Sequence, residues 1–278
     1  MIKIGTIFKK LIKRFQSEKV RGISWLQNHR NSHLYKHISE ETLLSSKKSN
    51  TVFIFGSGYS INDISQDEWK YFEKHDTISF NWFVYQKFVR IDYHIIKEIA
   101  PNDLDSSIWH PKFNEYSKNI AENPFYSKTI FIVQKGWKAT GGNRMIGLHL
   151  LSKNSNIFRY YISYRGKDRL PTFTFSEGLS HNGTLSLCIN FAWIMGWKKI
   201  VLVGVDLYDR RYFWLNQKET RDRDMMRGAS YKDQHNMSKV TVPLMNKWRK
   251  FFIKNNVELY VYNSKSLLAE VLPVYLMK

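Results

Sequence analysis

Short, continuous apolar runs separated by helical patterns restrict the fold of this sequence more than any other feature. Seven such runs occur, at Thr51–Phe55, Thr77–Phe80, Tyr93–Ile96, Thr129–Val133, Arg159–Ile162, Ile200–Val203 and Glu258–Val261. Strands that are apolar on both faces are typical of a parallel sheet, because helices cover both of its sides. The sequence therefore predicts an α/β fold with a mainly parallel sheet between two layers of helices.

The segments between the runs support this interpretation. Ser65 and Glu68 have the spacing of a capping box, which predicts a helix start there, and helical patterns extend over 184–195 and 238–254. Two stretches, 101–127 and 209–236, carry no clear period. Because long irregular loops inside compact domains are often functional, we expect 209–236 to form a lid on a Rossmann-like domain that spans 50–278.

Residues 1–49 form a basic segment ahead of this domain, with 11 lysines and arginines against three glutamates. Apolar residues recur at helical spacing from Ile4 to Phe15, with lysines between them, which predicts a basic amphipathic helix. Such a helix suits an anionic membrane surface, contacted through residues 1–16. The alternative, a helix docked on its own domain, is left open by the sequence.

The composition of the chain limits the partners and the cellular locations that fit it. The formal charge of +19 requires anionic partners, but the aromatic residues lie inside apolar runs and do not alternate with basic residues, so a nucleic-acid partner is not expected. No apolar run has the roughly 18–20 residues that span a bilayer, and no cleavable leader is evident. The single cysteine, Cys188, indicates a reducing, cytoplasmic location, peripheral to the membrane if the first helix binds lipid. A homo-oligomer is left open.

Polar and glycine residues follow several of the predicted strands. Because ligands of open parallel sheets bind beyond the carboxyl ends of the strands, these residues are the candidate site. They are Gly56, Ser57 and Gly58, then Asn81, then Asn182, Gly183 and Thr184, then Asp206 and Tyr208. The first glycines could bring backbone amides close to a phosphate. The dinucleotide fingerprint G-x-G-x-x-G is incomplete, because Ile61 occupies its last position, so a nicotinamide cofactor is disfavoured.

The order of these motifs resembles a known family. GSGYS after the first strand, SFN at the second, MGWKKI, VLVGVDLY, a charged loop, a histidine before a long helix and NSKSLLAEVLP are similar to the bacterial sialyltransferases of glycosyltransferase family 42. The resemblance covers roughly residues 50–270. A wider group of bacterial proteins, including flagellin-modifying glycosyltransferases and a pterin pyrophosphokinase-like branch, shares the early G-x-G and the G-x-D strand.

The resemblance implies a transfer of a CMP-activated nonulosonic acid, such as sialic acid, to a glycan or lipo-oligosaccharide hydroxyl, with inversion and without a metal ion or other cofactor. His235 matches the general base, a role that suits imidazole near neutral pH. Tyr208 and Tyr212 match tyrosines that donate hydrogen bonds to the departing phosphate. The nucleotide pocket would be lined by Ser57, Asn81, Gly183 and Thr184.

Some positions depart from the family. An arginine expected before Gly183 is absent, the nearest being Arg169, and Lys97 replaces an asparagine after the third strand. Lys97 would place a positive charge at the donor site. Asp222 and Asp224 have a metal-binding D-x-D spacing but lie among arginines. Two other functions therefore stay open: a pyrophosphokinase-like enzyme that uses a triphosphate and magnesium, and a non-catalytic, membrane-docked binding module.

Overall fold

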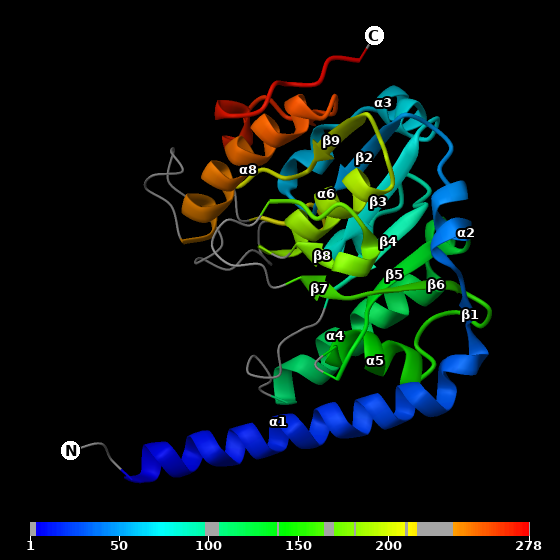
Figure 1. The fold of residues 1–278 in the computed structure, drawn as a ribbon, viewed down its shortest axis with the longest axis vertical. Helices are drawn as coiled ribbons and strands as arrows, with labels where there is room; N and C mark the ends of the chain where they lie inside the picture. Colours follow the sequence, from blue (N-terminus) through cyan, green and yellow to red (C-terminus); the bar gives the residue numbers. More distant parts are fainter. Residues whose placement is uncertain are drawn as a thin grey trace.

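The computed structural model describes residues 4–97, 106–137, 139–163, 170–180, 182–208, 211–215 and 236–277. Its centre is a sheet in which eight strands of the described chain pair in the order β1-β6-β5-β4-β3-β2-β9-β10, all in parallel (Figure 1). The strands are β1 (Lys36–His37), β2 (Thr51–Phe55), β3 (Asp76–Phe80), β4 (Tyr93–Ile96), β5 (Ile130–Gln134), β6 (Asn156–Tyr160), β9 (Lys199–Val203) and β10 (Glu258–Val261). The predicted Rossmann-like α/β class is confirmed.

Helices cover both faces of the sheet. They are α1 (Ile4–Asn31), α2 (Glu40–Ser45), α3 (Gln66–Phe72), α4 (Ser106–Glu122), α5 (Thr140–Gly147), α6 (Thr184–Ile194) and α8 (Asn236–Lys254). Alternate side chains of β2 point to opposite faces of the sheet. Ile54 packs in one buried cluster with residues of α6 and α8, and Phe53 packs in the other with residues of α3, α4 and α5. This alternation explains why the strands are apolar throughout.

Short 3₁₀ segments and a second, two-stranded sheet complete the fold. The 3₁₀ segments are η1 (Ser32–Leu34), η2 (Tyr59–Asp63), η3 (Asn81–Tyr85), η5 (Pro124–Tyr126), η6 (Phe175–Glu177) and η8 (Leu267–Glu270). The small sheet pairs β7 (Ile162–Ser163) with β8 (Leu179–Ser180). The predicted strand at Arg159–Ile162 was therefore wrong in its bounds, because β6 ends at Tyr160 and Ile162 pairs outside the main sheet.

The predicted helix start at Ser65 and two of the predicted helices are present in the structure. The capping box is present, with the Ser65 hydroxyl accepting from the Glu68 amide and the Glu68 carboxylate accepting from the Ser65 amide. α6 and α8 lie where helical patterns were recognised. The sequence left 101–127 unassigned, but 106–122 of that stretch forms α4, and α5 was also missed.

The N-terminal segment extends further into the fold than the predicted boundary at residue 50 indicates. α1 continues to Asn31, and β1 pairs with β6 to form the edge of the main sheet (Figure 1). Of the predicted lid 209–236, the structure describes only 211–215 and the first residue of α8, so the rest of this prediction lies outside the described residues. No helix of the described chain is both long enough and apolar enough to cross a membrane.

A buried polar chain links β3, β4 and α4. The His94 imidazole is fully buried; its Nδ1 lies 2.7 Å from the Ser79 hydroxyl, and its Nε2 is hydrogen-bonded to the Tyr116 hydroxyl. The Ser79 hydroxyl also lies 3.2 Å from the Tyr126 hydroxyl. Burial lowers the pKa of His94 to about 3, so the ring is neutral in the folded protein.

The stability of the protein is therefore expected to fall with acidification. Between pH 6.5 and the lowered pKa of His94, the unfolded chain binds a proton that the folded chain does not, and this favours unfolding. The free energy of unfolding should drop by about 2 kcal/mol from pH 7 to pH 5 through this group. Urea unfolding of wild-type protein and of His94→Phe over this range tests the assignment, because the variant should lose that part of the pH dependence; an identical slope in both proteins would refute it.

Candidate active site

The order of the strands places a crevice at the carboxyl ends of β2 and β9. From β2 the chain continues through β3, β4, β5 and β6 on one side, and β9 and β10 pair on the other side of β2. Such a reversal of strand order separates the loops that follow the two adjacent strands, and ligands of open α/β sheets bind there. The loops in question carry Gly56–Gly58 and Gly204–Asp206.

A pocket of about 420 Å³ occupies this position, within the usual size range for small-ligand sites. Ten of the twelve predicted site residues line it: Gly56, Ser57, Gly58, Asn81, Lys97, Asn182, Gly183, Thr184, Asp206 and Tyr212. The sequence interpretation missed Arg211, which follows β9, and three residues of α8: Thr241, Leu244 and Met245. These four carry no motif, and only the topology brings them to the sheet edge.

Two predicted residues stand apart from the pocket lining. Tyr208 is not among the residues that line the pocket, and its hydroxyl lies 3.4 Å from the Asn263 Nδ2 atom, at the long end of hydrogen-bonding distance. His235 lies outside the described residues. Its sequence position directly precedes α8, the helix that contributes Thr241 to the pocket.

The glycines after β2 allow the backbone to pass close to the end of β9 and the loop that follows it. They do not form an open phosphate-binding loop. The Gly56 amide donates to the Val203 carbonyl and the Gly58 amide donates to the Gly204 carbonyl, both at 2.8 Å. A Cβ atom at Gly58 would lie 2.5 Å from the Asp206 Oδ2 atom. The expectation that the Gly56 and Gly58 amides bind a phosphate is therefore wrong, because backbone carbonyls of the β9 loop already accept from them.

Asp206 ties three segments together from within the protein. Its buried carboxylate accepts from the Ser60 amide at 2.9 Å, from the Ser60 hydroxyl, and from the Asn263 Nδ2 atom at 3.3 Å. The backbone carbonyl of Asp206 accepts from the Leu267 amide at 3.1 Å. The carboxylate thus holds η2 and the chain after β10 against the β9 loop, which is a positioning role.

A second link joins the two most specific motifs of the sequence. The Ser266 hydroxyl donates to the Val205 carbonyl at 2.6 Å and also accepts from the Leu268 amide as the N-cap of η8. Together with the Leu267 amide, which donates to the Asp206 carbonyl, this hydrogen bond brings the NSKSLLA and VGVDLY segments into contact in the loop after β9.

Positive charge gathers around the pocket. Lys97 follows β4, and Arg211 lies with its guanidinium 3.8 Å from the centre of the Tyr59 ring. The N-terminus of α6 also faces the pocket through Asn182, Gly183 and Thr184. Because the first amides of a helix lack intrahelical acceptors and carry the positive end of its dipole, this end favours an anion.

Local backbone geometry explains how α6 begins at the pocket. Gly183, its N-cap residue, has φ 111° and ψ 167°, a conformation that favours glycine, and no side chain caps the helix there. The Ser186 hydroxyl donates to the Gly183 carbonyl at 2.8 Å and accepts from the Asn182 amide at 2.7 Å. Ser186 therefore fixes the turn without covering the first amides of the helix.

Two non-glycine residues at the pocket have left-handed backbone. Asn81 has φ 52° and Leu207 has φ 61°. Residues held in this sparsely populated region are costly and cluster at functional sites. Asn81 directly follows β3 and begins η3, and Leu207 lies in the loop after β9, so the strain lies in the segments that leave the sheet at the pocket.

Tyr212 belongs to a row of stacked rings at the pocket edge. Its ring stacks on Trp214 at 4.6 Å, and Trp214 stacks on Tyr85 at the same centroid distance. The segment that carries Tyr212 is anchored by a β-bridge to Gly58 and by the Asn62 Nδ2 atom, which donates to the Phe213 carbonyl at 3.1 Å. The Tyr212 side chain is 36% exposed and is held in place by its neighbours.

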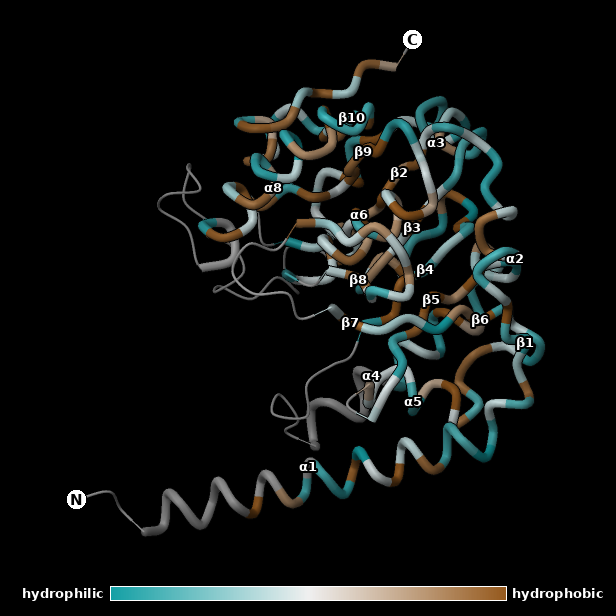
Figure 2. Tube along the Cα trace, viewed as in Figure 1, coloured by the Kyte–Doolittle hydropathy of each residue, from teal (hydrophilic) through white to brown (hydrophobic). Residues whose placement is uncertain are grey.

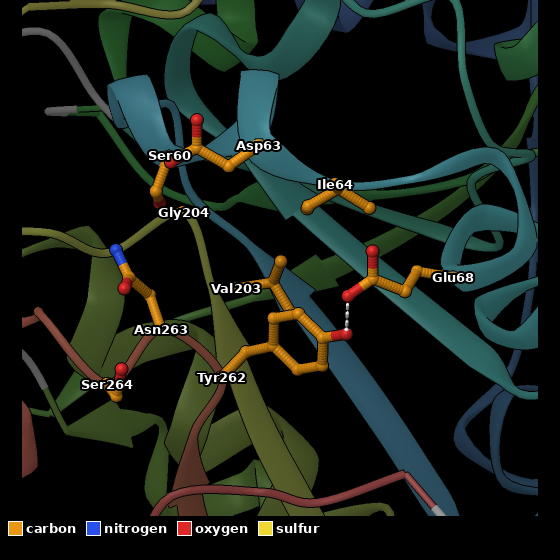
Figure 3. Close-up of a pocket in the computed structure, with 9 residues that line it drawn as sticks. All are labelled: Ser60, Asp63, Ile64, Glu68, Val203, Gly204, Tyr262, Asn263 and Ser264. Carbon is orange, nitrogen blue, oxygen red and sulfur yellow. Dashed lines mark hydrogen bonds between the residues drawn. The ribbon is translucent and has the colours of Figure 1, made fainter.

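A second, smaller pocket of about 180 Å³ has Ser60 and Asn263 in its lining and shares Gly204 with the first pocket. Figure 3 shows its lining residues. Its lining includes Asp63, Glu68 and Tyr262, and the Tyr262 hydroxyl donates to the Glu68 carboxylate. Burial and this carboxylate raise the pKa of Tyr262 above its ordinary value. Burial favours a higher pKa for Glu68, but hydrogen bonds from Ser65 and Tyr262 outweigh it, so the net shift is downward. The carboxylates and the small volume do not suit an anionic nucleotide.

Comparisons with known proteins give a distant likeness to solved structures. Models of protein families do not match the chain, and neither do curated proteins. A solved structure described as MAf glycosyltransferase from Magnetospirillum magneticum AMB-1 is similar at 16% sequence identity and a TM-score of 0.45, covering 82% of this chain and 33% of that one. The chain thus spans about a third of the length of that protein.

Proposed function

We propose that the protein is an inverting glycosyltransferase that moves sialic acid or a related nonulosonic acid from a CMP-sugar to a hydroxyl of a cell-surface glycan, without a metal ion. The observation that carries the proposal is the pocket at the β2–β9 crevice, which combines Lys97, Arg211 and the N-terminus of α6. These groups suit the single phosphate of a CMP-sugar. The resemblance of the ordered motifs to family 42 supports the choice of donor.

The proposal assigns a separate role to each of these groups. Lys97, Arg211 and the first amides of α6 neutralise the phosphate, and Tyr212 at the pocket edge stabilises it as it departs. Tyr208, which does not line the pocket, supports the same step indirectly, with its hydroxyl 3.4 Å from the Asn263 Nδ2 atom. His235, which directly precedes α8, removes the proton from the acceptor hydroxyl.

The pyrophosphokinase-like alternative would need carboxylates placed to hold magnesium against a triphosphate. Among the described residues that line the pocket, Asp206 supplies the only carboxylate, and Ser60 and Asn263 already engage it. The D-x-D pair, Asp222 and Asp224, lies outside the described residues. The shortage of carboxylates that could hold magnesium among the described pocket residues therefore favours the CMP-sugar proposal over the triphosphate one.

Lys97→Ala should weaken CMP binding by about tenfold to a hundredfold, because a hydrogen bond to a charged group contributes roughly 1.5–3 kcal/mol. Isothermal titration with CMP, without added metal, measures this. Lys87→Ala is the matched control, since Lys87 is an exposed lysine that does not line the pocket, and it should leave the affinity unchanged. Equal affinity in both variants would remove Lys97 from the donor site.

A further inference from the structure

Helix α1 is held against α5 by polar contacts. The Asn31 Nδ2 atom donates to the Gly147 carbonyl at 2.7 Å, and the Trp137 Nε1 atom donates to the Glu18 carboxylate at 3.2 Å. The Arg159 guanidinium donates to the Asn28 side-chain oxygen at 3.2 Å. Only the C-terminal part of the helix makes these contacts, and the N-terminal part runs past the edge of the domain (Figure 1).

The face of α1 that packs on the domain is polar or small, and its apolar face points outward. Ser24 is buried, with its hydroxyl donating to the Val20 carbonyl at 2.7 Å, and a Cβ atom at Gly22 would lie 3.2 Å from the Trp137 ring. Among the described side chains of α1, five large apolar ones are exposed instead: Ile12 at 43%, Phe15 at 74%, Ile23 at 46%, Trp25 at 37% and Leu26 at 61%. Soluble helices normally have the opposite arrangement.

Four of these five residues, Ile12, Phe15, Ile23 and Leu26, form one stripe along the helix. At 100° per residue, positions 12, 15, 23 and 26 fall within about 80° of one another, and Lys19 and Arg30 fall in the same sector. Ser24 lies on the opposite side. We name these six residues, Ile12, Phe15, Lys19, Ile23, Leu26 and Arg30, the outer stripe of α1. Hydrophobic segments along α1 are visible in the trace of Figure 2.

The charge of the helix indicates what covers the outer stripe. The sequence of α1 contains seven lysines and arginines and one glutamate. A second copy of the same helix would bring two strongly positive surfaces together, which is unfavourable. An anionic lipid surface offers both the negative charge and the apolar boundary region that exposed Phe and Leu residues require.

We propose that α1 lies flat on an anionic membrane surface with its outer stripe inserted at the headgroup boundary and the sheet domain held above it. The surface thus extends along the helix to Arg30, and not only over residues 1–16 as the sequence indicated. Trp137 is exposed at 44%, and its ring centre lies 5.8 Å from that of Trp25 at a tilted angle, so it lies beside the same helix and suits the interfacial region.

The test is co-sedimentation of the full chain with vesicles of phosphatidylcholine alone or with added phosphatidylglycerol. The variant Phe15→Gln/Leu26→Gln removes two members of the outer stripe. The matched control, Ile253→Gln/Leu276→Gln, removes two equally exposed apolar side chains elsewhere, at 58% and 76% exposure. Thermal unfolding of each protein verifies that it is folded.

Wild-type and control proteins should bind the anionic vesicles, bind neutral vesicles much more weakly and dissociate as salt rises. The stripe variant should bind at least about tenfold more weakly while keeping its melting temperature. The proposal is overturned if wild-type protein does not bind anionic vesicles or if both variants bind equally. It is also overturned if light scattering shows a dimer that the stripe variant disrupts while vesicle binding persists, because a second copy would then cover the stripe.

Discussion

Asp206→Ala is expected to lower the free energy of unfolding by about 3 kcal/mol or more. The substitution leaves the Ser60 amide and hydroxyl without their buried acceptor, and each lost hydrogen bond to a charged group costs roughly 1.5–3 kcal/mol. Because the same carboxylate also accepts from Asn263, the chain after β10 should loosen as well. Urea unfolding at neutral pH measures the change.

Two further variants make this prediction specific. Asp206→Asn keeps the shape and one acceptor oxygen, so its loss should be smaller than that of the alanine variant. Asp67→Ala removes an exposed carboxylate paired with Lys70 and should cost no more than about 1 kcal/mol. If Asp206→Ala is as stable as Asp67→Ala, the carboxylate does not hold the crevice together.

His235→Ala is expected to lower kcat by about 10²–10⁴-fold while CMP affinity changes little. A general base acts on the acceptor proton in the transition state and contributes little to nucleotide binding. The assay is CMP release from CMP-sialic acid in the presence of lactose, with CMP titration on the same preparation. Tyr212→Phe should instead slow donor cleavage both to lactose and to water, since its hydroxyl is proposed to stabilise the departing phosphate.

A structural role for His235 gives a different result. The residue directly precedes α8, so it could contribute to the start of that helix. Its replacement would then lower stability by about 0.5–2 kcal/mol and leave turnover intact. His33→Ala, at an exposed histidine, is the control for both measurements. A destabilised but fully active His235→Ala protein would remove His235 from the mechanism.

The strands and the edge on which the site lies could be predicted from sequence because their signals are local. β2, β4 and β10 have the predicted bounds, since each is a short apolar run between polar residues or turns. All strands of a parallel sheet run in the same direction, so the residues that follow them lie at the same edge of the sheet. Ten of the predicted residues line one pocket there. Their binding roles are a separate matter and remain predictions.

α5 could not be predicted because tertiary packing determines it. Its sequence, TGGNRMIG, contains three glycines and has poor helix propensity. A Cβ atom at Gly142 would lie 2.4 Å from the Val133 Cγ1 atom, and one at Gly147 would lie 2.7 Å from the Gln27 Cβ atom. The glycines allow the helix to approach β5 and α1 closely, and α1 is distant from α5 in sequence.

Two further features, the acceptors of the Gly56 and Gly58 amides and the direction of the apolar stripe of α1, also depend on residues distant in sequence. The acceptors of the Gly56 and Gly58 amides belong to the loop after β9, well over a hundred residues away, so a G-x-G turn alone does not reveal them. Likewise, the helical spacing of apolar residues in α1 shows a stripe but not its direction. Because α5 offers α1 a polar and glycine-containing surface, the stripe turns outward.

The central claim, a pocket for a CMP-sugar, is tested most directly by a thermal-shift comparison of CMP, UDP, GDP and ATP, each with and without a divalent cation. CMP alone, at 100 times its dissociation constant, should stabilise the folded protein by about 2.7 kcal/mol, and added metal should change this little. Lys97→Ala should reduce the shift. Stabilisation by UDP or GDP only with Mn²⁺, or by ATP only with Mg²⁺, together with no response to CMP, would contradict the account.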